Sequence, residues 1–255
     1  MCGIAAILLY PGDRPVEQWQ AIKQAFSMNL ILNEQRGTAA SGVAVIDAGG
    51  TVALHKSPLP ASLFTRTAEY QRTLNYVGAQ TSLILGHTRF PTKGNPNKDP
   101  NNHPIWTGTV VGVHNGEITN DDELFILWGY ERTADVDSEI LFRLVGNADP
   151  TTSPDKYLDT LSQRIQLAKG EFTFLACDQR KPQHIVVAKH ANPLWIHFHR
   201  QWNALVFSSR YIFFRKAFGG SLLVESLPRD VLMLFDAMLL PQLGCAPKTA
   251  FPMHL

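Results

Sequence analysis

The stretch MCGIAAILLY, residues 1–10, decides how the rest of the chain is interpreted. Residues 4–9 form an unbroken apolar run, which predicts a β-strand. Cys2 stands just before this strand, and its small side chain permits removal of the initiator methionine. Removal would leave a thiol and a free α-amine on the same residue, which together form a self-contained nucleophile and base.

The thiol and the α-amine of such a residue suit each other chemically. An α-amino group titrates near ~8 and a thiol near ~8.5, so proton transfer between them is feasible at neutral pH. The amine can accept the thiol proton and later protonate a leaving ammonia. Taken alone, however, Cys2 favours a plainer interpretation, a small buried residue at the start of a strand.

Composition narrows the class of protein. The 255 residues suffice for one large domain or two small ones. With 23 basic and 22 acidic residues the net charge is +1, which excludes a nucleic-acid binder that acts through bulk charge. No apolar run approaches the ~18 residues of a transmembrane helix, and no signal peptide is evident. Three widely spaced cysteines form no disulfide framework, so we expect a cytoplasmic protein.

A loop at residues 91–104 divides the chain, because it holds four prolines and four asparagines. Strands are predicted on either side of it, at residues 82–90 and 109–114, and each ends in polar residues where chemistry would sit. The elements predicted earlier in the chain are a helix entered through Pro15, a hairpin of residues 42–47 and 51–55, and a helix after Pro60.

After this loop, helices are predicted to begin at Asp121 and at Ser153-Pro154. Later strands are predicted at residues 172–176, 185–188, 194–198, 204–207 and 231–235. Helices and strands therefore come in blocks, which favours an α+β layered fold. We expect one domain that extends to about Asp236, followed by a short tail.

Several short motifs accompany Cys2 in a fixed order along the chain. They are Cys2-Gly3-Ile4, Arg36-Gly37 with Ser41-Gly42, His87-Thr88-Arg89-Phe90-Pro91-Thr92, Asn102-His103-Pro104, His114-Asn115-Gly116 with Asn120, and Asp137-Ser138-Glu139. Together they resemble the class II, N-terminal-nucleophile glutamine amidotransferases. The resemblance implies a four-layer αββα sandwich, with a glutaminase domain over residues 1–236 and a tail over residues 237–255.

The resemblance also implies a catalytic set. Cys2 would attack the glutamine carboxamide, and the side-chain amide of Asn115 with the N–H of Gly116 would stabilise the tetrahedral oxyanion. By itself, Asn-Gly after a strand is more often a tight turn. Arg36 matches the family arginine near the nucleophile, which would position Cys2 rather than contact substrate.

The resemblance also implies a set of substrate-binding residues. The α-carboxylate of free glutamine calls for guanidinium donors and its α-ammonium for an acidic group, and Arg89 and Asp137 are the family-matched candidates. Thr92 would add a hydroxyl to the carboxylate, and His103 would line the pocket. The plainer alternatives are a surface salt bridge for Arg89 and a helix N-cap for Asp137.

Three positions depart from the family pattern. Ala39 stands where aspartate is common, Phe90 where tryptophan is frequent, and Lys93 where many members have histidine. These changes leave the nucleophile and the oxyanion donors in place but bear on glutamine preference. Lys93 adds a cation near the carboxylate end, so we still expect a ligand with an α-carboxylate.

Other motifs favour no additional chemistry. His197-Phe198-His199, with His184 and His190, invites a zinc interpretation, but without a cysteine or carboxylate partner ordinary strand histidines are favoured. The sequence contains no nucleotide-binding glycine motif and no serine-hydrolase GxSxG motif. We therefore expect no cofactor and no metal.

Three functions remain open at this stage. The first is glutamine hydrolysis with ammonia passed to a separate synthase subunit, since too few residues follow Asp236 for an acceptor domain. The second is a free-standing amidohydrolase that acts on a γ-glutamyl or related amide. The third is a non-catalytic binding protein of the same fold, which retention of Met1 would favour. A homo-oligomer also stays open.

Overall fold

Strand β1 (Gly3–Leu9) is buried along its whole length because other elements cover both of its faces. Ile4 and Leu8 pack between two stacked sheets, whereas Ile7 packs beneath helices on the opposite side. This double covering accounts for the unbroken apolar run at the start of the sequence. The computed structural model describes residues 1–219 and 222–253.

The sheet that contains β1 is antiparallel throughout. Its other strands are β2 (Ala40–Asp47), β3 (Val52–Ser57), β4 (Thr81–Arg89), β9 (Trp195–His199), β10 (Ala204–Ser208) and β11 (Glu225–Ser226). Their spatial order is β11-β9-β10-β1-β4-β2-β3, so β1 lies at the centre with β10 and β4 as neighbours. The start of β1 therefore lies beside the end of β4, where Gly3 is paired with Thr88.

The second sheet packs face to face on the first. Its strands are β5 (Ile105–Thr107), β6 (Val110–Ile118), β7 (Gly170–Asp178), β8 (His184–Lys189), β12 (Val231–Asp236) and β13 (Thr249–Pro252). They are antiparallel in the order β13-β12-β8-β7-β6-β5. Because β6 extends to Ile118, Asn115 and Gly116 lie within a strand and not in a turn after it.

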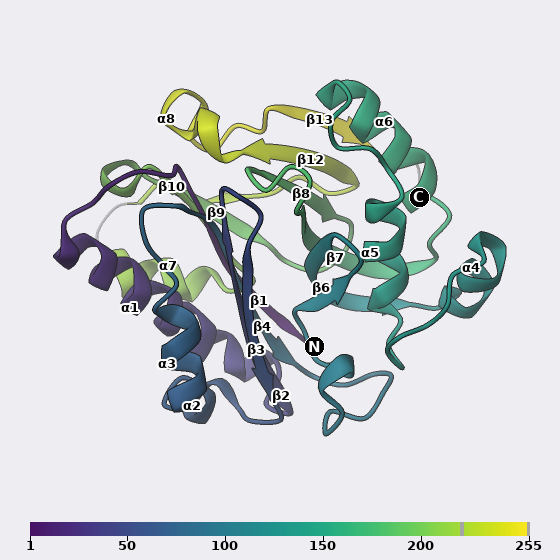
Figure 1. Cartoon of the computed structure of the whole chain (residues 1–255), viewed down its shortest axis with the longest axis horizontal. Helices are drawn as coiled ribbons and strands as arrows, with labels where there is room; N and C mark the ends of the chain where they lie inside the picture. The colour runs from purple at the N-terminus through teal and green to yellow at the C-terminus, as the bar shows by residue number, and fades with distance from the viewer. Residues whose placement is uncertain (220–221, 254–255) are drawn as a thin grey trace.

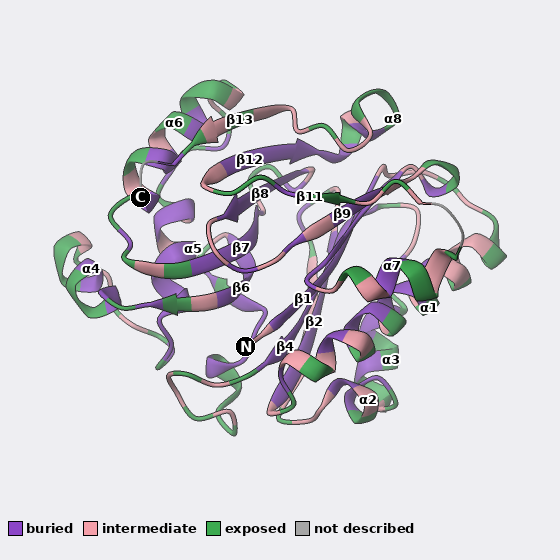
Figure 2. Cartoon of the chain, turned by 180° about the vertical axis from the view of Figure 1, so that it is seen from behind, coloured by how far each residue is buried: buried purple, intermediate pink, exposed green. Residues whose placement is uncertain are grey.

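Helices cover the outer face of each sheet, which gives four layers (Figures 1 and 2). Those on the first sheet are α1 (Val16–Asn33), α2 (Ala61–Phe64), α3 (Ala68–Leu74) and α7 (Tyr211–Phe218). Those on the second are α4 (Asp121–Trp128), α5 (Ser138–Gly146) and α6 (Pro154–Ile165). The remaining helical turns are η1 (Glu34–Arg36), η2 (Asp99–Asn101), η3 (Arg200–Trp202), η4 (Ala237–Leu239) and α8 (Leu240–Leu243). The α+β class and the αββα layering are thus confirmed.

Several local expectations changed in detail. The helix predicted after Pro60 is the single turn α2, followed by the separate helix α3, whose N-cap is the Thr67 side chain. The loop at residues 91–104 contains only the short turn η2. The segment expected as a tail, described over residues 237–253, contains the short helix α8 and the strand β13, which pairs with β12 at the edge of the second sheet.

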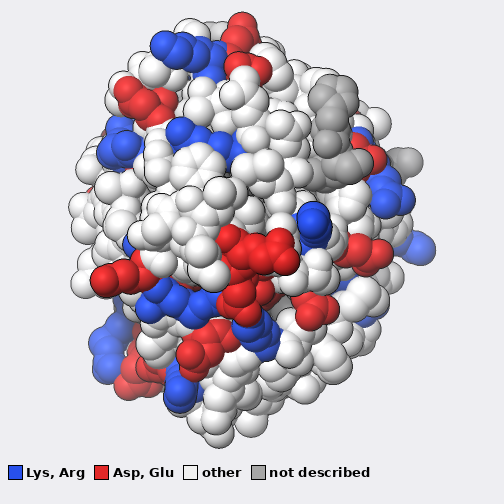
Figure 3. Space-filling model, turned by 90° about the vertical axis from the view of Figure 1, so that its right-hand side faces the viewer, with Lys and Arg blue, Asp and Glu red and all other residues white. Residues whose placement is uncertain are grey.

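The surface agrees with the balanced composition. On the face seen in Figure 3, acidic and basic side chains are interspersed, and no continuous basic stripe crosses it. In residues 1–219 and 222–253, no helix is long and apolar enough to cross a bilayer.

Three histidines are buried between the strands near Cys2. The ring centroids of His87 and His103 lie 4.3 Å apart, and that of His114 lies 6.4 Å from that of His103. His87 donates through Nε2 to the carbonyl oxygen of His114 at 2.8 Å. Burial lowers the pKa of all three imidazoles, that of His87 to about 3, so they are neutral at physiological pH.

This cluster predicts sensitivity to acid. An unfolded histidine takes up a proton near pH 6.5, whereas folded His87 resists protonation until about pH 3, so stability is lost as the pH falls between these values. From about pH 7 to about pH 5, His87 alone should cost roughly 2 kcal/mol of unfolding free energy. Urea denaturation at the two pH values measures this. In the variant His87→Gln the pH-dependent loss should shrink by about that amount, and an unchanged slope would contradict the assignment.

Candidate active site

Cys2 lies where the start of β1 meets the end of β4. Its Sγ is 3.3 Å from both the N and the O of Phe90, so the thiol accepts from one backbone group and donates to the other. Nε of Arg36 donates to the Cys2 carbonyl oxygen at 2.6 Å. The chain terminus lies at the edge where the two sheets diverge (Figures 1 and 2). Arg36 thus contacts the backbone of Cys2.

The surroundings of the thiol act on its ionisation in opposite directions. Burial raises the pKa of Cys2, and this effect outweighs the lowering by the Phe90 N–H, the amino terminus and Arg89. The thiol is therefore protonated at neutral pH in this structure. A nucleophilic thiolate would need a base beside it.

Gly116 and Asn115 present polar groups next to Cys2. Gly116 has φ 134°, and a Cβ there would lie 1.8 Å from the carbonyl oxygen of Glu171, so only glycine fits. Nδ2 of Asn115 donates to Oγ of Ser209 at 2.9 Å, and Ser209 Oγ also accepts from the backbone N–H of Ile4 at 2.9 Å. Ser209 therefore fixes Asn115 relative to the start of β1.

The other candidate residues converge on the same place. A small cavity is lined by Cys2 and Gly116 together with Arg89, Thr92, His103 and Asp137. It adjoins a larger opening of about 370 Å³, whose lining includes Cys2, Phe90, Thr92, Gly116 and Asn192. The structure thus brings together every substrate-binding residue proposed from the sequence. Of the other candidates, Arg36 donates to the Cys2 carbonyl oxygen, and the carbonyl oxygen of Asn115 accepts from Asn192.

Arg89 is buried at the end of β4 and is not a surface salt bridge. Its two terminal nitrogens donate to Asn102 Oδ1 at 2.8 Å and to the carbonyl oxygens of Lys93 and Gly94 at 2.6 and 2.9 Å. The guanidinium therefore organises the loop at residues 91–104. Cys2 and Asp137 both act on the pKa of Arg89, which burial lowers, so the three groups are close enough to interact electrostatically.

Asp137 is buried and does not cap α5 with its side chain. Its Oδ2 accepts the backbone N–H of Ile118, the last residue of β6, at 2.7 Å. Oδ1 makes no protein hydrogen bond within the described part of the chain. The carboxylate is thus held through one of its two oxygens.

His103 is held from outside the cavity. Lys56 on β3 donates through Nζ to the carbonyl oxygens of Asn102 at 2.7 Å and Pro104 at 3.2 Å, on either side of His103. Burial lowers the pKa of Lys56 to about 8. Lys56, Ser209 and Asn192 were not identified from sequence as site residues, because each reaches the site through strand pairings distant in the chain.

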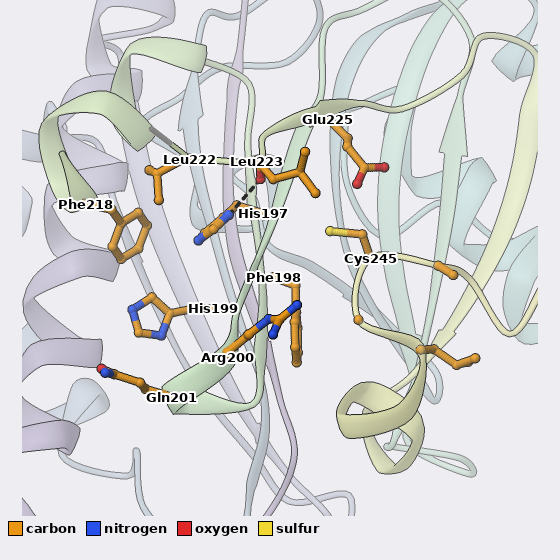
Figure 4. Close-up of a pocket in the computed structure, with 13 residues that line it drawn as sticks. His197, Phe198, His199, Arg200, Gln201, Phe218, Leu222, Leu223, Glu225 and Cys245 are labelled. Atoms are coloured by element: carbon orange, nitrogen blue, oxygen red, sulfur yellow. Dashed lines mark hydrogen bonds between the residues drawn. The ribbon is translucent and has the colours of Figure 1, made fainter. Parts of the chain in front are cut away.

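The four histidines of the zinc interpretation do not converge. His184 contacts Asp236 and His190 contacts Asp230, whereas His197 and His199 border a separate cavity of about 800 Å³ (Figure 4). There, His197 donates through Nδ1 to the carbonyl oxygen of Leu223 at 2.9 Å. Over residues 1–219 and 222–253, no group of three potential ligands is placed to hold a metal ion.

Comparison with known proteins agrees with this geometry. Residues 91–216 match the model of a family described as a glutamine amidotransferase domain. Glutamine–fructose-6-phosphate aminotransferase of Haemophilus influenzae is 30% identical over 188 residues, which cover 69% of this chain and 29% of that protein. The same enzyme of Tropheryma whipplei is 30% identical over 210 residues, covering 80% and 32%. The chain thus spans about a third of the length of these curated relatives.

Solved structures share the fold. Glutamine phosphoribosylpyrophosphate amidotransferase of B. subtilis superposes with a TM-score of 0.72 at 18% identity, over 100% of this chain and 50% of that one. A glutamine aminotransferase class-II domain protein from Silicibacter pomeroyi superposes with a TM-score of 0.59 at 14% identity, over 99% of both chains. The sequence matches show that the chain belongs to the glutamine amidotransferase family, and the solved structures show that it has the class II fold.

Proposed function

We propose that this chain hydrolyses glutamine with Cys2 as the nucleophile. The observation that carries the proposal is the common cavity, where the Cys2 thiol lies with a guanidinium and a carboxylate suited to the two ends of a free amino acid. Sγ would attack the side-chain carboxamide carbon, and the C–N bond would break to release ammonia. Water would then hydrolyse the γ-glutamyl thioester to glutamate.

The thiol proton needs an acceptor, and in the proposed mechanism that acceptor is the α-amine of Cys2 itself. After removal of Met1, this amine would take the thiol proton and give it to the departing nitrogen, so that ammonia leaves neutral. Asn115 and the N–H of Gly116 would donate to the oxyanion that forms in between. A reducing compartment such as the cytoplasm suits this chemistry, because the thiol must stay free.

Recognition of the amino-acid end divides between two sides of the cavity. Arg89 and Thr92 would bind the α-carboxylate, and Oδ1 of Asp137 would accept from the α-ammonium. His103, neutral because it is buried, would line the wall between them. Arg36 would hold the Cys2 carbonyl and so aim the thiol.

Replacement of the nucleophile tests the mechanism directly. Cys2→Ser should lower kcat for glutamine by at least about 1000-fold, because a hydroxyl is a far poorer nucleophile than a partly ionised thiol. The affinity label 6-diazo-5-oxo-norleucine should attach to Cys2 alone, with Cys245→Ser as the matched control that keeps activity and labelling. Intact mass should show loss of Met1 in active protein, and turnover by protein that retains Met1 would rule the mechanism out.

The ammonium subsite makes a separate prediction. Asp137→Asn should raise KM for glutamine by roughly 10- to 100-fold, since a charged hydrogen bond to the substrate is lost. Glutaramate, which has the carboxylate and carboxamide but no α-ammonium, should react equally with both proteins. If the substitution impaired both substrates alike, Asp137 would be supporting the fold and not binding the ammonium.

The fate of ammonia is part of the proposal. The curated relatives are named as aminotransferases that act on glutamine and a sugar phosphate, and we propose by analogy that a synthase protein consumes the ammonia released here. The isolated chain should release glutamate and free ammonia in a 1:1 ratio. In a complex purified from the source cells with its acceptor substrate present, free ammonia should fall below glutamate. Equal amounts in that complex would refute transfer.

A further inference from the structure

The loop that covers the small cavity is anchored at Lys93. Its carbonyl oxygen accepts from Arg89 at 2.6 Å, which fixes the backbone, while its side chain extends to helix α4. There Nζ lies 2.7 Å from Oδ2 of Asp121 and 3.3 Å from Oδ1 of Asp122. Lys93 also lines the small cavity, but its ammonium is paired with carboxylates of this chain.

A second cation binds the same two carboxylates. Arg132 donates to Oδ2 of Asp121 at 2.9 Å and also contacts Asp122, and its guanidinium carbon lies 4.0 Å from the ring centroid of Phe125. The Asp121 side chain is only 5% exposed. Two cations thus neutralise two carboxylates, one of them buried, which is the balance that a buried charge requires.

This cluster of Lys93, Arg132, Asp121 and Asp122 joins the two sides of the cavity. Lys93 follows Thr92 and Arg89, on the side that would bind the carboxylate. Arg132 donates through its other terminal nitrogen to the carbonyl oxygen of Val136 at 3.2 Å, directly before Asp137 on the ammonium side. The cluster therefore fixes the separation of the two subsites.

We propose that Lys93 and Asp121 are positioning residues that clamp the loop at residues 91–98 to helix α4 and so set glutamine affinity. The inference rests on the proposed function, since it concerns the same pocket. The clamp acts through the position of the loop, so it does not require the Lys93 ammonium, which is paired with Asp121, to contact substrate. Loss of the clamp should let the carboxylate side move away from Asp137, which weakens binding of a ligand that must span both.

A second ion pair on the same loop provides the contrast. Lys98 lies 3.1 Å from Asp135, so it too connects this loop to the segment before Asp137. The side chains of Lys98 and Asp135 are 65% and 59% exposed, and an ion pair that exposed contributes little to stability. Lys98 is therefore the matched control for Lys93.

The test compares Lys93→Met with Lys98→Met in steady-state kinetics. We expect KM for glutamine to rise by about 10-fold in Lys93→Met with kcat within about threefold, and to stay unchanged in Lys98→Met. Lys93→Arg should restore KM, because it keeps the charge. The double variant Lys93→Met/Asp121→Asn should be no worse than the worse single variant. Equal KM values for Lys93→Met and Lys98→Met would overturn the proposal.

A second readout separates this inference from the proposed function. Hydrogen exchange of the amides at residues 92–98 should accelerate in Lys93→Met but not in Lys98→Met, with or without turnover. Acceleration in a protein that never hydrolyses glutamine would support the clamp and refute the glutaminase. Unchanged exchange in an active enzyme would refute the clamp alone.

Discussion

The hydroxyl of Ser209 joins the two sheets at the point on which the site depends. It accepts the N–H of Ile4 and the side-chain N–H of Asn115, both at 2.9 Å, so the start of β1, next to Cys2, is bound to β6 of the other sheet. Ile4 and Ser209 are 205 residues apart in sequence, and only the pairing of β1 with β10 brings them together. In the proposed mechanism this contact would help to fix Cys2, beside β1, relative to the oxyanion donors on β6.

Around this point the protein buries polar groups and keeps most of them neutral or bound to backbone carbonyls. His87, His103 and His114 stay uncharged, and the ammonium of Lys56 binds two carbonyl oxygens. Several ring nitrogens of these histidines, both of His103 among them, have no hydrogen-bond partner in the described residues, so the cluster is not a closed hydrogen-bond network. The Asp137 carboxylate, held through Oδ2, lines the same cavity as His103 and His114.

Elements that are defined by a local sequence pattern could be predicted from the sequence. The apolar run at residues 4–9, the helix entered through Pro15 and the strand ending near Arg89 were confirmed, because burial and capping are local signals. The αββα layering followed only from family resemblance. The extension of β6 through Gly116 was missed, since Asn-Gly ordinarily signals a turn and only pairing with β7 overrides it. Ser209, Lys56 and the partners of Lys93 depend on contacts between distant segments, which no local pattern encodes.

The geometry around the thiol also limits which base can act. Within residues 1–219 and 222–253, Sγ of Cys2 forms hydrogen bonds only with the backbone of Phe90, and no side-chain base reaches it. His103 and His114 line the cavity, but His114 is bonded to Ser138, and burial lowers the pKa of both rings. Burial raises the pKa of the thiol, so the thiolate that the proposed mechanism needs depends on a base that takes the thiol proton. In that mechanism the base is the α-amine that removal of Met1 would expose on the same residue.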